Sequence, residues 1–290
     1  MRTLQVSFRA ICPIRIKKFR GRKDECISDL FEKFGGFNMS KNGLAWKATA
    51  AALAIICNIN QAPAADITVL STVAAHSVVD KVRSSFEQKT GHHLVVRFET
   101  AASLKREIET GSKFDVFLLT KEASAALESE GKLPSGKSRP FAVVLLGLAA
   151  KEGTSIPDIS SPEKLMAALF QARKISYASE GASGKSFLRL LGAHGMLEPL
   201  REKLMPLPAS EVIEAVASGK VTYGVQLISE IVAVRGATLV AALPTEYQSP
   251  TSLTIGCSTD PCARPSFELV EFLSSDAAAV AAIKAAGMEQ

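Results

Sequence analysis

Residues 66–290 contain no tryptophan, because the single tryptophan of the chain is Trp46. Aromatic side chains supply the large flat faces on which sugar rings stack, so this absence argues against sugar binding. The chain also has no H-E-x-x-H and no C-x-x-C spacing. We therefore expect no bound metal ion and no cofactor.

Beyond residue 66 the chain has no long hydrophobic span, no low-complexity tract and no internal repeat. The apolar run at 48–57 is shorter than the ~20 residues that a spanning helix needs. Lys41 and Lys47 precede this run, and Ala62-Pro63-Ala64 follows it as an A-x-A cleavage signal. Residues 39–65 are therefore predicted to be a secretory signal peptide, cleaved near Ala64 or Ala65.

Residues 1–38 form a basic extension upstream of this segment. Either Met39 is the true start and the extension is not translated, or the extension is a disordered basic cytoplasmic arm. Residues 1–65 hold 11 Lys/Arg against 4 Asp/Glu, whereas residues 66–290 hold 23 against 25. The basic isoelectric point of the chain is therefore due to residues 1–65, and we expect no nucleic-acid partner.

Residues 66–290 alternate between strand-like and helix-like patterns. This order predicts an α/β fold with parallel or mixed sheets covered on both faces. Strands are predicted at 67–71, 94–98, 115–119, 174–178, 221–225, 239–243 and 252–256, with a long apolar run at 142–150. Helices are predicted at 73–89, 103–110, 122–130, 162–170, 185–191, 212–217 (capped by Ser210), 229–234 and 265–286, the last broken near Ser275.

The segment 174–191 combines a short strand, a loop of small residues and the start of a helix. The first N–H groups of a helix lack internal partners and favour an anion. Gly184-Lys185-Ser186 ends like a nucleotide P-loop, but Ser179 stands where the first glycine should be, and no magnesium-binding Asp is evident. Ser183 lies in G-A-S-G-K and not in the G-x-S-x-G of a hydrolase. A small-anion loop and an ordinary strand–helix turn remain open.

Several longer segments resemble the periplasmic substrate-binding proteins of molybdate-type ABC transporters. They are ITVLSTVAAHSVVDKVRSSFEQKTG, FETAASLKREIETGSKFDVF, YASEGASGKSFLRLLGAHG, SEVIEAVASGKVTYGVQLISEI and FLSSDAAAVAAIKAAGM. The resemblance implies a two-lobed type II periplasmic-binding-protein fold. Each lobe would be a mixed sheet flanked by helices, with two crossover strands between the lobes. Lobe 1 would comprise 66–145 and 246–290, and lobe 2 would comprise 146–245.

The same resemblance implies a ligand site in the interlobe cleft. Serine and tyrosine donors usual in the family are replaced by Ala74, Ala101 and Leu227. Neighbouring hydroxyl and amide groups or backbone N–H groups would then supply the donors. The implied ligand-binding set is Ser71, Thr72, Ala74, Thr100, Ala101, Ser183, Gly184, Val212, Gln226 and Leu227.

The chemistry of this site decides which anion it takes. Molybdate and tungstate are fully deprotonated at neutral pH and need donors only, whereas phosphate carries a proton and favours an acceptor. Glu99 is the candidate acceptor, or else a solvated strand end. Lys185 either neutralises the anion or points away.

The sequence therefore predicts an exported, periplasmic solute-binding protein, a monomer and not an enzyme, that binds a molybdate-like oxyanion and presents it to an inner-membrane ABC permease. Alternatives are a receptor for phosphate, sulfate or a small organic anion, or an enzyme on the same fold that acts on an anionic substrate.

Cys257 and Cys262 are the only cysteines after residue 66. They flank a predicted turn, and an oxidising compartment permits a disulfide between them. Two free thiols without a structural role are the alternative.

Overall fold

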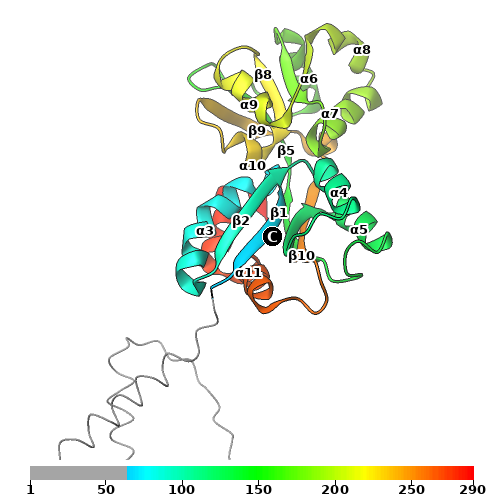
Figure 1. The fold of residues 1–290 in the computed structure, drawn as a ribbon. Helices are drawn as coiled ribbons and strands as arrows, with labels where there is room; N and C mark the ends of the chain where they lie inside the picture. Colours follow the sequence, from blue (N-terminus) through cyan, green and yellow to red (C-terminus); the bar gives the residue numbers. More distant parts are fainter. Residues whose placement is uncertain (1–63) are drawn as a thin grey trace, which may run out of the picture. The chain divides into compact units, whose positions relative to one another are not determined.

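The computed structural model describes residues 64–290. The predicted basic extension and nearly all of the predicted signal peptide lie outside these residues. The described part is a mixed α/β structure with two sheets, each flanked by helices, as the sequence predicted (Figure 1). None of the helices within 64–290 is long and apolar enough to cross a membrane.

The first sheet has six strands in the order β11-β4-β10-β3-β1-β2. β1, β2 and β3 are mutually parallel, while β10 runs antiparallel to β3 and to β4. The strands are β1 (Asp66–Thr72), β2 (His93–Glu99), β3 (Val116–Thr120), β4 (Arg139–Val144), β10 (Thr251–Cys257) and β11 (Met288–Glu289). The accompanying helices are η1 (Val73–Ala75), α3 (His76–Thr90), α4 (Ala101–Glu109), α5 (Lys121–Ser129), α11 (Arg264–Ser275) and α12 (Ala277–Ala285).

The second sheet has five strands in the order β7-β6-β8-β5-β9. β6 is parallel to β7 and β8, and β5 is antiparallel to β8 and β9. The strands are β5 (Leu146–Lys151), β6 (Ile175–Ala178), β7 (Leu204–Leu207), β8 (Tyr223–Leu227) and β9 (Ala237–Ala242). The helices are α6 (Pro162–Gln171), α7 (Ala182–Ala193), α8 (Leu197–Leu200), η2 (Arg201–Lys203), α9 (Ala209–Ala217) and α10 (Ile228–Ile231), and η3 (Thr245–Tyr247) precedes the return to β10.

The hydrophobic core lies between each sheet and its helices. α3 shows the pattern most clearly, because Val78, Val79, Val82 and Phe86 are buried on one face at helical spacing. Phe86 meets Phe272 of α11 edge to face, with ring centroids 5.3 Å apart. The helix therefore packs on its sheet through the residues that its periodicity marked as apolar.

The apolar run at 142–150 is divided between the two sheets. β4 ends at Val144 and β5 begins at Leu146, so the chain crosses from one sheet to the other at Leu145. The return crossing, residues 243–250, lies beside the first because of Gln248. The Gln248 side chain accepts from Leu146 N (3.1 Å) and donates to Leu146 O (2.9 Å) and Leu243 O (2.9 Å).

Several helix starts differ from the prediction by one to three residues, and two of these differences change the role predicted for a residue. α7 begins at Ala182 and not at Lys185, so Ser183 and Gly184 are helical rather than part of a loop. α9 begins at Ala209 after Pro208, and Ser210 is not its cap. Proline fixes φ near the helical value and favours helix starts, and it displaced the serine that the sequence pattern suggested. Ser161 caps α6, with its hydroxyl accepting from Lys164 N.

Cys257 and Cys262 are joined by a disulfide, with their Cα atoms 5.6 Å apart. The bridge closes a short loop between β10 and α11. In the chain-entropy description, a loop of this length stabilises the fold by about 2 kcal/mol.

We expect the double substitution of both cysteines by serine to lower the free energy of unfolding by about 2 kcal/mol. Urea denaturation of the mature protein measures this loss. Thiol counting on the unreduced, unfolded wild-type protein should find none, and two reactive thiols would contradict the pairing. Reducing agent should destabilise the wild type but leave the double variant unchanged.

Candidate functional site

The carboxyl ends of the parallel strands in both sheets meet at one cavity. β1 and β3 end at Thr72 and Thr120, and β8 ends at Leu227. In open α/β sheets, ligands bind outside the carboxyl ends of the strands. The cavity has a volume of about 30 Å³ and is lined by Thr72, Val73, Ala74, Thr100, Ala101, Thr120, Glu180, Gly181, Ala182, Ser183, Ala209, Leu227, Glu230 and Thr251.

This volume holds about two water molecules, since one water needs roughly 10–15 Å³ of such space. In this conformation the cavity therefore suits a compact group and not a sugar or a peptide. Residues from both sheets contribute to its wall. Any ligand held there contacts both lobes at once.

Three threonines give the cavity hydroxyl donors. Thr100 Oγ1 caps α4 by accepting from Ser103 N (3.2 Å), and Thr120 Oγ1 caps α5 by accepting from Ala123 N (3.3 Å). A hydroxyl that accepts in a cap still has its own proton to donate. Thr72 Oγ1 is buried and has no hydrogen-bond partner among the described residues. These groups are suited to an acceptor-rich ligand.

Several helices begin at the cavity wall, including α4 at Ala101, α7 at Ala182 and α9 at Ala209. Their first N–H groups have no intrahelical partner, and their dipoles place positive potential at this end. Together with the hydroxyls, they make the cavity wall a set of donors. Such a wall favours an anion.

The start of α7 depends on two glycines. Gly181 has φ of 136°, a conformation that favours glycine, and it turns the chain from the strand side into the helix. Gly184 lies so close to β6 that a Cβ atom would be 1.8 Å from Ala178 O. Close backbone packing therefore fixes the α7 N-terminus against the end of β6.

The structure brings six of the ten predicted ligand residues into the cavity wall: Thr72, Ala74, Thr100, Ala101, Ser183 and Leu227. The other four, Ser71, Gly184, Val212 and Gln226, lie behind it. Ser71 Oγ donates to Thr72 O (3.2 Å), and Gln226 Nε2 donates to Ala209 O (2.9 Å). Val212 is buried in the core, where its carbonyl accepts from Ser176 Oγ (2.9 Å). These four residues position the wall.

Eight wall residues were not in the predicted ligand set, and among them Glu230 carries a carboxyl oxygen that solvent does not reach. Glu230 as a whole is partly exposed. Its Oε2 atom is inaccessible to solvent and has no hydrogen-bond partner among the described residues. Burial raises the pKa of the Glu230 carboxyl to about 7, although hydrogen bonding by the Gln226 side chain and the Leu227 backbone opposes the rise. The cavity therefore contains a carboxyl group that changes protonation near neutral pH.

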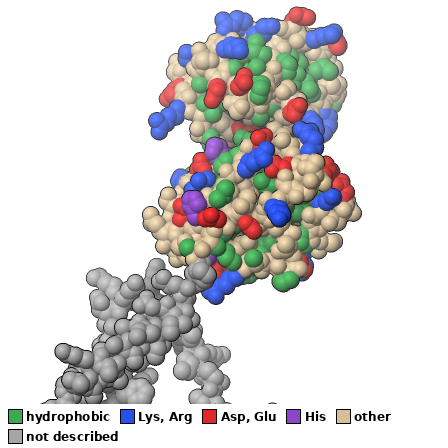
Figure 2. Space-filling view, in the orientation of Figure 1, with side chains coloured by type: hydrophobic (Ala, Val, Ile, Leu, Met, Phe, Trp, Pro, Cys, Tyr) green, Lys and Arg blue, Asp and Glu red, His purple; other side chains and the backbone are tan. Residues whose placement is uncertain are grey.

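The charged residues considered from the sequence lie elsewhere. Glu99 ends β2 and is not part of the cavity wall. Lys185 lines a neighbouring cavity of about 390 Å³, together with Lys105 and Arg189, that shares Ala101 and Gly181 with the first. Acidic and basic side chains are interspersed on the visible face of the described part (Figure 2). Basic groups therefore line the neighbouring cavity and not the first one.

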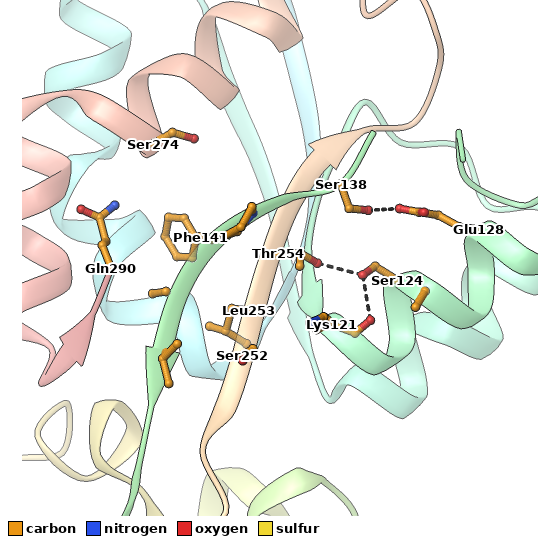
Figure 3. A pocket seen from close by; sticks show the side chains of 14 residues that line it. Lys121, Ser124, Glu128, Ser138, Phe141, Ser252, Leu253, Thr254, Ser274 and Gln290 are labelled. Atoms are coloured by element: carbon orange, nitrogen blue, oxygen red, sulfur yellow. Dashed lines mark hydrogen bonds between the residues drawn. The ribbon is translucent and has the colours of Figure 1, made fainter. Parts of the chain in front are cut away.

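A larger cavity, about 580 Å³, is a different place. It lies beside α5, β4 and β10, and Gln290 forms part of its wall (Figure 3). Several of its polar groups are paired with one another: Thr254 Oγ1 donates to Ser124 Oγ (2.9 Å), and Ser138 donates to Glu128. Among the described residues, none that lines this cavity has a buried side-chain polar atom without a partner. Within residues 64–290, no group of three or more His, Cys, Asp or Glu side chains is arranged to hold a metal ion. Unpaired donors therefore distinguish the small cavity.

We expect Gly184→Ala to destabilise the protein by about 3 kcal/mol, because the added methyl group overlaps the Ala178 carbonyl. Gly192→Ala is the matched control on the same helix, since a Cβ there meets nothing within 4 Å. That control should be neutral or stabilising by up to about 1 kcal/mol. Equal effects of the two substitutions in chemical denaturation would refute the close contact.

We expect Glu230→Gln to stabilise the protein at alkaline pH and not at acidic pH. The pKa of Glu230 is raised to about 7 in the folded state, above the ~4.3 of an unfolded glutamate. The folded state therefore holds the proton more strongly, and stability is lost as pH rises through this window. Melting curves should show a gain on the order of 2 kcal/mol at pH 8 and little at pH 4. A gain that is independent of pH would contradict this.

Comparison with known proteins places this geometry in a family. Residues 67–289 match the family described as bacterial extracellular solute-binding protein. An aconitate isomerase from Pseudomonas sp. is 26% identical over 195 residues, covering 65% of this chain and 74% of that protein. The molybdate-binding protein ModA from Azotobacter vinelandii is 24% identical over 172 residues, covering 59% of this chain and 68% of ModA.

Solved structures agree on the fold. The periplasmic molybdate-binding protein of Azotobacter vinelandii superposes with a TM-score of 0.65 at 19% identity, covering 77% of this chain and 99% of that chain. Campylobacter jejuni Peb3, in its structure with L-phospholactate bound, gives 0.60 at 12% identity, covering 78% and 100%. The resemblance to molybdate-type substrate-binding proteins is thus confirmed for family and fold. The chain belongs to the bacterial extracellular solute-binding proteins.

Proposed function

We propose that this protein captures a small oxyanion in the cavity between its two sheets and delivers it to an inner-membrane ABC permease. The observation that carries the proposal is a wall of donors without protein partners, formed by threonine hydroxyls and by the first turns of several helices. A water-sized cavity with these donors favours a compact anion. The predicted signal peptide supports export to the periplasm.

Three of the similar proteins are named for anions or hold one. ModA is named for molybdate, the Peb3 structure holds L-phospholactate, and aconitate isomerase acts on an unsaturated tricarboxylate. Molybdate and tungstate are our first candidates because their four oxygens accept hydrogen bonds and need no protein acceptor. Phosphate, sulfate and small organic anions are the alternatives, since Ala74, Ala101 and Leu227 stand where the resemblance implies donors.

A second candidate function is isomerisation of a small unsaturated carboxylate. Glu230 favours it, because a carboxyl that titrates near neutral pH at the cavity can remove a proton from one carbon and return it to another. Such a step consumes no other reactant, and it leaves the carboxyl as it began. NMR spectra of cis-aconitate with the protein in D₂O test this: exchange of carbon-bound hydrogen supports the enzyme, and its absence supports the receptor.

We expect Ala101→Asp to abolish anion binding while leaving the fold intact. Ala101 begins α4, where an aspartate suits the helix dipole, but it also lies in the cavity wall. The negative charge of the aspartate would weaken the binding free energy of the anion by several kcal/mol, which is a loss of at least about a hundredfold in affinity.

Thermal shift with a panel of molybdate, tungstate, phosphate, sulfate and cis-aconitate measures this effect. At one hundred times Kd, the wild type should gain about 2.7 kcal/mol, a shift of roughly 5–10 °C. Ala277→Asp is the matched control, because it places the same residue at the start of α12, outside the cavity wall. A wild type that no anion stabilises, or an Ala101→Asp protein that binds as well as the control, would disprove the site.

A further inference from the structure

Glu230 lies where the two lobes touch. It belongs to α10, the short helix that follows β8 of the second sheet, and α10 packs against η1 and α3 of the first lobe. The same residue lines the cavity with Thr72 and Ala74 from the first lobe. The Glu230 carboxyl is therefore within reach of a ligand that bridges the lobes.

The buried polar atoms around Glu230 are unusually short of partners. Glu230 Oε2, Ser229 Oγ and Gln226 Oε1 come from β8 and α10, and Thr72 Oγ1 comes from the end of β1. Buried polar atoms in folded proteins nearly always have a partner, so a group of four without one calls for an explanation. Two of these residues, Glu230 and Thr72, line the cavity, and a bound ligand that accepts hydrogen bonds from both supplies their missing partner.

An ionised glutamate at this position conflicts with anion binding. It would place a second negative charge against the ligand, and it offers no proton to donate. A protonated glutamate removes the charge and becomes a donor like the neighbouring hydroxyls. The wall is chemically consistent as an anion site only when Glu230 carries its proton.

We infer that an anion enters this cavity together with a proton carried by Glu230, whose carboxylic acid donates a hydrogen bond to the ligand. This inference rests on the proposed function and specifies its ligand class. At neutral pH the ligand is an anion that has acceptor oxygens and no proton to donate, such as a tetraoxo dianion. An anion that needs a protein acceptor does not belong to this class.

The surroundings of Glu230 support this assignment. Burial is the main cause that raises its pKa to about 7, and only Gln226 and Leu227 oppose it. No charged side chain contributes to the shift, and an incoming anion would favour the protonated form further. Ionisable groups on the elements packed against α10, on the C-terminal segment and across the cavity are His76, Asp80, Lys81, Arg83, Glu87 and Lys89 of α3, Lys151 of β5, Tyr223 of β8, Glu180 beside α7, Lys284 and Glu289. Glu87 pairs with His93 (2.9 Å) and Lys89 with Asp276 (2.7 Å).

Most of these groups are engaged elsewhere. His76 Nε2 lies 2.9 Å from Asp80, and Arg83 lies 3.7 Å from the same carboxylate. Glu180 shares the cavity wall, but its side chain is 72% exposed and lies 3.9 Å from Arg106. Glu180 is therefore a carboxyl at the same cavity in a solvated setting, and it provides a matched control.

Calorimetric titration of the mature protein with molybdate tests the inference, because molybdate does not titrate in this pH range. Titrations in two buffers of different ionisation enthalpy count the protons taken up on binding. The wild type should take up about one proton at pH 8.5 and few at pH 6.5, and its affinity should fall about twentyfold between these values. Tungstate serves as a second probe of the same class.

Glu230→Gln should bind molybdate with no proton uptake and with an affinity that is nearly constant over this range, because glutamine imitates the uncharged donor. Glu180→Gln should keep the pH dependence of the wild type. The melting curve of Glu230→Gln at pH 8 verifies that this variant is folded.

Binding without proton uptake by the wild type, or an undiminished pH dependence in Glu230→Gln, would overturn the inference and leave the proposed function standing. If neither probe nor any anion of the panel binds at pH 6.5, the proposed function fails and this inference fails with it.

Discussion

The structure depends on how the chain crosses twice between two separate sheets. Leu145 alone separates β4 from β5, and the return crossing is held beside it by strand pairing on both sides and by the Gln248 side chain, which bonds to both backbone groups of Leu146. An amide can do this because it offers a donor and an acceptor, as a strand neighbour would. Two crossings held side by side keep the strand ends of both sheets at one cavity. A ligand there contacts both lobes, so its binding energy acts on the relative position of the lobes.

Donors gather at this cavity as a consequence of the topology. Each parallel strand is followed by a helix, so strand ends and helix starts occur together. Thr120 ends β3 and Thr100 directly follows β2, both cap helices, and both residues line the cavity. Gly184 lets α7 approach β6 more closely than any side chain would permit. The site is thus built largely from backbone and small residues, and it needs few specialised side chains.

The sequence was sufficient for the fold class and for most elements, because helices such as α3 have one clear apolar face. Periodicity alone carried no information in the run at 142–150, which is apolar throughout because β4 and β5 are both buried. The lobe boundary at 145/146 came from the family resemblance instead. The sequence failed at α7 and at Glu230. α7 starts earlier than predicted because it packs against Ala178, and the local sequence pattern does not reveal this tertiary contact. Glu230 was missed because α10 is a single turn, too short for a pattern to indicate which residue faces a cavity.

A carboxyl that titrates near pH 7 would give this cavity two chemical roles, depending on its ligand. In the protonated form, Glu230 would be a donor that helps to hold an anion. In the ionised form, it is a base that could act on an acidic carbon–hydrogen bond, if the ligand has one within reach. A tetraoxoanion has no such bond, so the same carboxyl can only bind it. The ligand's own chemistry, rather than a separate set of catalytic residues, would then decide whether this cavity only binds or also catalyses.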